Sequence, residues 1–204
     1  ELQYIILSEE GSAGTVSVFG YTPGESVQPP AEVIIPSEVT HGAVTYSVTC
    51  IAQQAYCLNK TVGSVTIPAS VTGIEDSAFS GCTQLTNLSV DEENKIYSSA
   101  DGVLFNKAKS TLIQYPTGKE GEYAIPDTVT EISSGAFSEC TGLLGITIPN
   151  GVVEILDATF YGCSKLAAVI IPDSVTGIGY GAFDSCENLA NVTIGNGVAG
   201  IGGE

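Results

Sequence analysis

Apolar and polar positions recur along the chain with a period of 23 residues. Each copy of the pattern begins with Ile-Pro and continues with Val, Ile, Ala, Phe, Cys, Leu, Val and Ile at near-constant spacing. Three copies follow one another without a gap, a fourth stands apart, a degenerate copy precedes the fourth, and a truncated copy ends the chain. In that order, the copies begin at Ile125, Ile148, Ile171, Ile67, Val48 and Ile194. A unit of this length cannot bury its own apolar side, so the repeat predicts a stack of similar coils.

Each repeat contains two predicted elements. Residues 85–90 end with alternating apolar and polar positions, which predict a short strand with its apolar residues facing inward. In other copies a proline follows this strand and would end its pairing, because proline donates no backbone hydrogen bond. Ala78, Phe79 and Cys82 lie three and four positions apart, which predicts a single helical turn with the phenylalanine in the core.

Two stretches interrupt the period. Residues 90–124 contain Asp101-Gly102 beside apolar residues, a hairpin signal, and predict an enlarged repeat with an extra hairpin. Residues 1–47 hold short β-rich runs between turns of Gly, Pro and Ser, and predict a cap over the open end of the stack. We therefore expect a β-rich N-terminal cap over residues 1–47 and one continuous solenoid over residues 48–204.

The charge of the chain narrows the range of partners. It has 23 acidic residues against six lysines, no arginine, and a formal net charge of -17. Nucleic acid is not an expected partner, because phosphate and base contacts depend on Lys and Arg. Attraction to an anionic membrane surface is disfavoured for the same reason, and no run of about 18 apolar residues is present that would insert into a bilayer. The chain begins without a leader and stops in mid-pattern, so we expect it to be a piece of a longer protein.

The unit IPxxVxxIxxxAFxxCxxLxxVxIP, carried by residues 67–90 and 125–194, resembles the BspA-like leucine-rich repeat family of bacterial and protist surface proteins. Residues 97–107 and 41–49 also look like segments of that family. The resemblance implies an α/β repeat fold: a right-handed leucine-rich repeat solenoid with short strands on its concave face and helical turns or irregular segments on its convex side. It also implies a secreted or cell-surface location and a role in adhesion. It carries over no catalytic motif and no cofactor.

Two functions are compatible with such a solenoid. The favoured one is a binding module whose partner is a protein or glycan on the surface of a host or neighbouring cell. The alternative is a structural spacer that presents other domains and has no ligand of its own. An enzyme is not expected, because the sequence has no glycine-rich phosphate loop, GxSxG elbow or HExxH motif.

The outward-facing positions of the strands form the candidate binding surface. Since the apolar residues of each strand face inward, the residues between them face outward on the concave sheet. The candidates on this surface are Ser64, Thr66, Asn87, Ser89, Thr147, Ile170, Asn191 and Thr193. Their small, mostly uncharged side chains leave two interpretations open. They reflect strand propensity alone, or an extended partner lies across the sheet and contacts them row by row.

The cysteines also allow two interpretations. Four of them occupy one register, three residues after the phenylalanine, and predict a buried column of reduced thiols. An even number of cysteines in a secreted protein also leaves open disulfides between neighbouring coils, or a bridge between the two off-register residues. No CxxC spacing is present, so a zinc site is not predicted. The register cysteines are Cys82, Cys140, Cys163 and Cys186, and the other two are Cys50 and Cys57.

Three remaining features have simple structural interpretations. His41 is the only histidine and has no partner at a catalytic spacing, so we expect an exposed turn residue. Residues 91–93 and Asp101 offer oxygen ligands for calcium but lack the EF-hand spacing, and a solvated loop is favoured. Asn59, Asn87 and Asn191 begin N-x-S/T motifs, which matter only in a eukaryotic secretory pathway.

Overall fold

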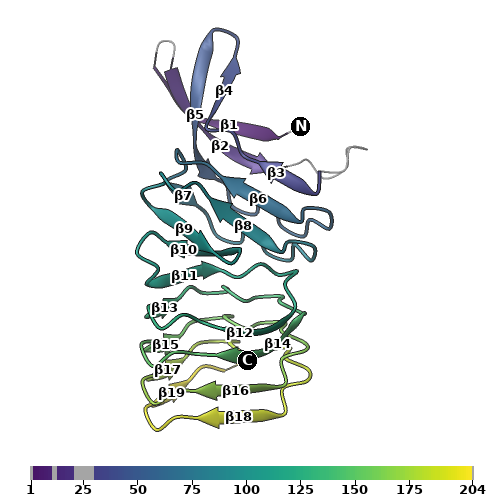
Figure 1. Cartoon of the computed structure of the whole chain (residues 1–204), viewed down its shortest axis with the longest axis vertical. Coiled ribbons are helices and arrows are strands. Elements are labelled where there is room, and N and C mark those ends of the chain that lie inside the picture. Colours follow the sequence, from purple (N-terminus) through teal and green to yellow (C-terminus); the bar gives the residue numbers. More distant parts are fainter. Residues whose placement is uncertain (1, 11–12, 21–29, 204) are drawn as a thin grey trace.

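The computed structural model describes residues 2–10, 13–20 and 30–203. Over these residues the chain winds into a β-solenoid of about seven turns, with the N-terminal strands at one end of the stack (Figure 1). The strands are confirmed where the repeat predicted them. No helix occurs in the described part of the chain, so the predicted α/β class is wrong.

The longer strands of the coils form the surface that we call the strand face. It consists of two parallel sheets, one with strands in the order β3-β6-β8 and the other in the order β12-β14-β16-β18. Side chains alternate as predicted: Val65, Leu88, Ile146 and Val169 are buried, and their neighbours in sequence point outward. The strands are β3 (Glu32–Ile34), β6 (Ser64–Ile67), β8 (Asn87–Val90), β12 (Gly121–Ala124), β14 (Leu143–Thr147), β16 (Ala168–Ile171) and β18 (Asn191–Ile194).

A second face is built from very short strands, each ending in an isoleucine; Ile132, Ile155 and Ile178 are buried, and Ile201 in the last coil is exposed. β15, β17 and β19 pair in parallel, one per coil, with Ile155 opposite Ile178 and Ile178 opposite Ile201. The conserved spacing of 23 residues brings these isoleucines into one column. The strands of this face are β7 (Gly73–Ile74), β13 (Glu131–Ile132), β15 (Glu154–Ile155), β17 (Gly177–Ile178) and β19 (Gly200–Ile201).

Consecutive turns replace the predicted helical turn on the third side of each coil. In five coils the backbone enters the left-handed region twice, four residues apart, which an α-helix cannot accommodate. The cause is hydrogen bonding between coils. The N–H of Phe137 donates to the carbonyl of Thr159 at 2.9 Å, and that of Phe160 to Ala182 at 2.8 Å, where a helix would use these groups internally. The left-handed pairs are Gln54 and Leu58, Ser77 and Gly81, Gly135 and Glu139, Ala158 and Gly162, and Gly181 and Ser185.

The aromatic residues of these turns stack in a column, as expected for residues at one register. Ring centroids are 5.0 Å apart for Tyr115 and Phe137, 5.1 Å for Phe137 and Phe160, and 5.1 Å for Phe160 and Phe183. Phe79 stacks in the same way on Tyr56, at 5.6 Å. Tyr56 and Tyr115 therefore take the place of phenylalanine in the irregular coils.

The enlarged repeat contains the predicted hairpin. β9 (Tyr97–Ala100) and β10 (Val103–Asn106) pair antiparallel around Asp101-Gly102, and β11 (Thr111–Gln114) joins β10 to β13. β10 is buried on both sides. Leu104 belongs to the hydrophobic core of the N-terminal half, whereas Val103 and Phe105 belong to the core of the C-terminal half. β10 thus separates two hydrophobic cores.

The N-terminal cap is a sheet in the order β1-β2-β5-β4. β5 extends to Ile51 and also pairs with β7 of the first coil, so the cap and the solenoid share backbone hydrogen bonds. β5 runs across residue 47, the predicted domain boundary. These strands are β1 (Gln3–Glu10), β2 (Ala13–Gly20), β4 (Glu38–His41) and β5 (Val44–Ile51).

Candidate functional site

Half of the predicted binding residues lie together on the C-terminal sheet of the strand face. Thr147, Ile170 and Thr193 stand next to one another across β14, β16 and β18, and Asn191 lies on β18 in the neighbouring column. All four side chains are exposed. The inward neighbours of Thr147 and Ile170 are buried in the core, whereas those of Thr193, on the last strand, are about half exposed. Pairing of the strands holds the outward row at the regular spacing of a parallel sheet.

The other four predicted residues lie apart from this group, on the N-terminal sheet. Ser64 faces Asn87, and Thr66 faces Ser89, across β6 and β8. The hydroxyls of Thr66 and Ser89 are 3.0 Å apart and hydrogen-bond to each other, and both residues are only partly exposed. The enlarged repeat separates β8 from β12, so the eight candidates do not form one continuous surface.

The C-terminal sheet carries two shallow grooves, one on each side of the exposed Ile170. Each encloses about 470 Å³. The first runs over Gly145 and Ala168, whose small side chains leave room above the sheet, with Glu122 on β12 among its lining residues. The second follows the corner where the strands end, and its polar lining includes Asn150, Asp173 and Asn196.

Sequence reasoning missed β12 as part of this surface. Glu122 pairs with Gly145 and Ala124 with Thr147, so these two residues extend the two outward columns by one strand. The signal was present in the sequence, because β12 is followed by Ile125-Pro126, the pair that follows the strands of the regular repeats. Glu122 is exposed and adds a carboxylate to a face otherwise made of hydroxyls, amides and small apolar groups.

All six cysteines are free, so no bridge joins Cys50 to Cys57 or links neighbouring coils. Three of the register thiols are buried as predicted, whereas Cys186, in the last full coil, is only partly buried. Three register thiols donate hydrogen bonds to the backbone carbonyl of the aromatic residue in the preceding coil. The Sγ–O distances are 2.8 Å from Cys82 to Tyr56, 3.2 Å from Cys163 to Phe137 and 3.1 Å from Cys186 to Phe160. Burial raises the pKa of Cys82 to about 12, which keeps its thiol protonated and unreactive at neutral pH.

The remaining candidate residues lie in exposed turns and loops or make local hydrogen bonds to the backbone. His41 is exposed at the end of β4, beside Gly42 in the left-handed region. Residues 91–93 are exposed, and the Asp91 carboxylate accepts the N–H of Glu93 at 2.8 Å. Asn59 replaces the register cysteine and accepts the N–H groups of Thr61 and Val62. Within the described ranges, no three His, Cys, Asp or Glu side chains are placed to hold a metal ion.

A stack of parallel coils, in which each 23-residue unit contributes two short strands and one stacked aromatic residue, is the architecture of a leucine-rich repeat solenoid. The chain belongs to the BspA-type leucine-rich repeat family, whose model matches residues 36–120 and 115–204 in six copies. Proteins of this family are typically binding modules rather than enzymes.

Solved structures of bacterial proteins share the fold. A leucine-rich repeat protein from Eubacterium ventriosum is 33% identical, with a TM-score of 0.70 over 80% of this chain and 42% of that one. One from Bacteroides ovatus is 25% identical, with a TM-score of 0.61 over 99% and 54%. The pneumococcal vaccine antigen PcpA is 20% identical, with a TM-score of 0.57 over 99% and 83%, and is similar in fold.

The chain spans less than half the length of the Eubacterium protein. None of the curated proteins compared with the chain matches it. In the described part of the chain, the structure contains no helix of the length and apolarity that a membrane span requires.

Proposed function

We propose that the chain is a binding module of a secreted or cell-surface protein, and that its partner lies across the outward face of β12, β14, β16 and β18. The partner in this proposal is a protein or glycan on the surface of a host or neighbouring cell. Membership of the BspA-type family supports the surface location. The proposed contact residues are the exposed Thr147, Ile170, Asn191 and Thr193.

The observation that carries this proposal is the exposure of Ile170. Its side chain is 66% exposed at the centre of the sheet, between Thr147 and Thr193, with a groove on either side. Covering an isoleucine of this exposure removes apolar surface from water, which contributes about 1–2 kcal/mol to association. The hydroxyl and amide groups around it add direction, because each can donate and accept hydrogen bonds.

The side chains on the face determine the expected affinity and its dependence on salt. The outward columns of β14, β16 and β18 hold no charged residue, although the whole chain carries a net charge of -17. Binding there should depend only modestly on salt, since few charges take part. One copy should bind weakly, because the columns carry no arginine or aromatic anchor, and many copies on a cell surface would strengthen attachment.

The test is adhesion of beads coated with the protein to cultured host cells. Thr147→Glu and Thr193→Glu together place two charges on the face and should abolish adhesion while circular dichroism stays unchanged. Thr130→Glu with Thr176→Glu is the matched control, because these threonines are exposed beside the second face and the charge change is identical. Adhesion that survives the first pair would reject the strand face as the site.

A structural spacer is the second candidate function. Hydrogen bonds between threonine hydroxyls and neighbouring coils favour it. Thr176 donates to the carbonyl of Val153 at 3.2 Å, and the hydroxyls of Thr66 and Ser89 bond to each other. If the protein is a spacer, the only role of these threonines is to stabilise the stacking of the coils. Coated beads without any adhesion, before any substitution, would support the spacer.

A further inference from the structure

The enlarged repeat adds strands to one side of the solenoid and not to the other. Three strands, β9, β10 and β11, pair in one sheet with β13, whereas the strand face has only β8 and β12 over the same part of the chain. β8 and β12 do not pair with each other, and in Figure 1 β6 and β8 slant across the view while β16 and β18 lie nearly level. The strand face is therefore broken between β8 and β12.

The two edges at this break differ. The edge of β8 is occupied by the hairpin: the N–H of Leu88 donates to the carbonyl of Gly102 at 2.9 Å, and that of Val90 to the hydroxyl of Ser99 at 3.0 Å. β12 ends its sheet and has no second partner strand among the described residues. Gly121 and Ile125 donate towards β14, so the alternating N–H groups of Glu122 and Ala124 face the break.

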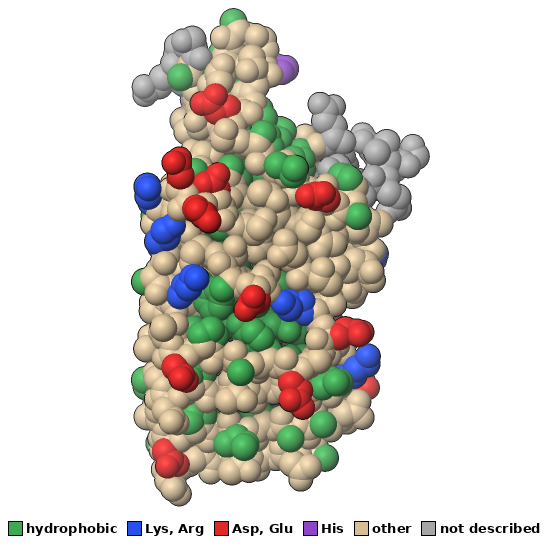
Figure 2. Space-filling model, viewed as in Figure 1, with side chains coloured by type: hydrophobic (Ala, Val, Ile, Leu, Met, Phe, Trp, Pro, Cys, Tyr) green, Lys and Arg blue, Asp and Glu red, His purple; other side chains and the backbone are tan. Residues whose placement is uncertain are grey.

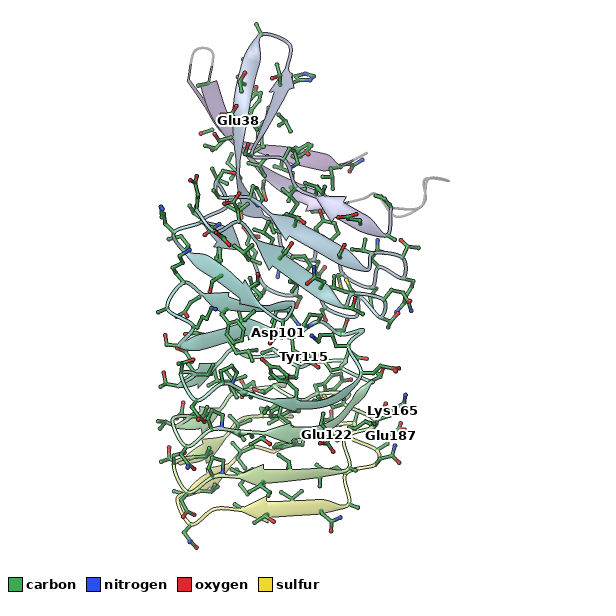
Figure 3. All side chains as sticks on the ribbon, in the orientation of Figure 1. Glu38, Asp101, Tyr115, Glu122, Lys165 and Glu187 are labelled. Atoms are coloured by element: carbon green, nitrogen blue, oxygen red, sulfur yellow. The ribbon has the colours of Figure 1, made fainter. Side chains whose placement is uncertain are left out.

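A hollow with hydrophobic side chains on its floor lies at the break (Figure 2). Asp101 lies at its upper side in this view and Glu122 below it, and the buried Tyr115 lies between them (Figure 3). Tyr123, half-buried on β12, packs its ring 4.8 Å from that of Tyr115. The partly exposed Tyr123, backed by the buried Tyr115, thus lies at the open strand edge.

The charge around the hollow is negative. Asp101, Glu120 and Glu122 are exposed. Lys119 also lies at the break, and its ammonium is already engaged, donating to the backbone carbonyl of Asp101 and lying 5.9 Å from the Tyr115 ring centroid. An occupant with positive charge would therefore be favoured here over a neutral or acidic one.

We propose that the edge of β12 accepts an extended segment of a partner protein as an added strand, with a basic side chain beside Glu122 and an apolar side chain beside Tyr123. Open strand edges pair with extended chains, and side chains that alternate along the strand set the specificity. On β12, Glu122 points outward and Tyr123 inward, so the matching segment alternates basic and apolar residues. This site adjoins the outward face of the sheet and shares Glu122 with it, but it depends on backbone pairing at the open edge of β12 and stands if the function proposed above fails.

A fluorescein-labelled peptide of alternating lysine and valine is the probe, and fluorescence anisotropy measures its binding. Ala124→Pro removes the N–H that faces the break, at an edge position where proline is tolerated, and should weaken binding about tenfold or more. Ala124→Ser keeps the N–H and should bind as the parent does. Glu122→Lys should weaken binding more than Glu154→Lys, which makes the same charge change at an exposed site on the second face.

Hydrogen exchange gives an independent readout, because an added strand would protect the amides of Glu122 and Ala124. It also decides the matter if Ala124→Pro fails to fold. Absence of peptide binding, equal binding by the proline and serine variants, or unchanged exchange at these amides would each overturn the proposal. Equal losses for Glu122→Lys and Glu154→Lys would do so too, since they indicate attraction to the acidic surface as a whole.

Discussion

The thiol of Cys163 donates a hydrogen bond to the backbone carbonyl of Phe137, which lies in the preceding coil, with 3.2 Å between Sγ and O. Both residues are fully buried. Cys163 belongs to the thiol column and Phe137 to the aromatic column, so this contact ties the thiol of one coil to the backbone of the aromatic residue in the coil before it. The Phe137 carbonyl also accepts the N–H of Cys140 at 3.1 Å, so the thiol supplies a second hydrogen bond to a buried acceptor, which favours a cysteine at this register over a purely apolar residue.

Replacement of Cys163 by alanine should lower the free energy of unfolding by about 1–3 kcal/mol, from a small cavity and a lost hydrogen bond. Serine should cost less than alanine at this position, because its hydroxyl can donate to Phe137. Cys140 is the matched control. Its thiol is 4.0 Å from the nearest carbonyl oxygens, so serine there should be worse than alanine. Urea unfolding of the four variants measures whether serine or alanine is the more stable at each site. The same ranking at both sites would contradict the role of the hydrogen bond.

Phe160→Ala should lower the free energy of unfolding by about 3–5 kcal/mol. The Phe160 ring is fully buried and stacks between Phe137 and Phe183, each at 5.1 Å. Phe183→Ala should cost distinctly less, because that ring is only partly buried at the end of the column. Thermal melts of both variants against the parent test this, and equal shifts in melting temperature would be inconsistent with the column as described.

The protein should lose stability between about pH 9 and pH 12. Burial raises the pKa of the Cys82 thiol from 9.0 to about 12, and that of Tyr123 from 10.0 to about 12. Above pH 9 the unfolded chain releases these protons while the folded chain retains them. The contribution of the two groups to the free energy of unfolding is therefore fully present below pH 9 and is lost as the pH rises towards 12. Urea unfolding at several pH values measures the slope. Tyr123→Phe should flatten it, and a slope identical to the parent's would refute the contribution of Tyr123.

Substitutions on β10 should act on different halves of the molecule. Leu104→Ala should weaken the N-terminal core, and Phe105→Ala the C-terminal core, because the two side chains lie in separate hydrophobic clusters. Hydrogen exchange should show faster opening of β6 and β8 in the first variant and of β14 and β16 in the second. Uniform acceleration in both variants would indicate a single cooperative core instead.

Much of the fold could be predicted because a strand reveals its two faces through alternation. Val169 is apolar and buried and its neighbour Ile170 points outward, as the pattern required. The helical turn was wrong because a spacing of three and four residues also fits two consecutive turns. Ala158 is in the left-handed region although alanine has no preference for it, and the hydrogen bonds between coils that hold it there leave no trace in the sequence.

The candidate site could be predicted only in part. The outward direction of Thr147 and Thr193 followed from alternation, but the separation of Ser64 and Asn87 from them depends on how the inserted hairpin pairs. Its tip meets β8 so closely that a side chain carbon on Gly102 would lie 2.9 Å from Asn87 Oδ1. Contacts of this kind arise between segments far apart in the chain, and periodicity does not report them.

The separation of the two hydrophobic cores by β10 affects how the number of coils can change during evolution. Repeat proteins gain and lose coils by duplication and deletion of whole units, and each new coil must fit the side chains of its neighbours. Leu104 presents one side of the hairpin to the first core, and Val103 and Phe105 present the other side to the second. Coils can therefore be added or removed on either side of residues 97–106 without repacking the other side, and the two arms of the solenoid are free to evolve different lengths and different surfaces.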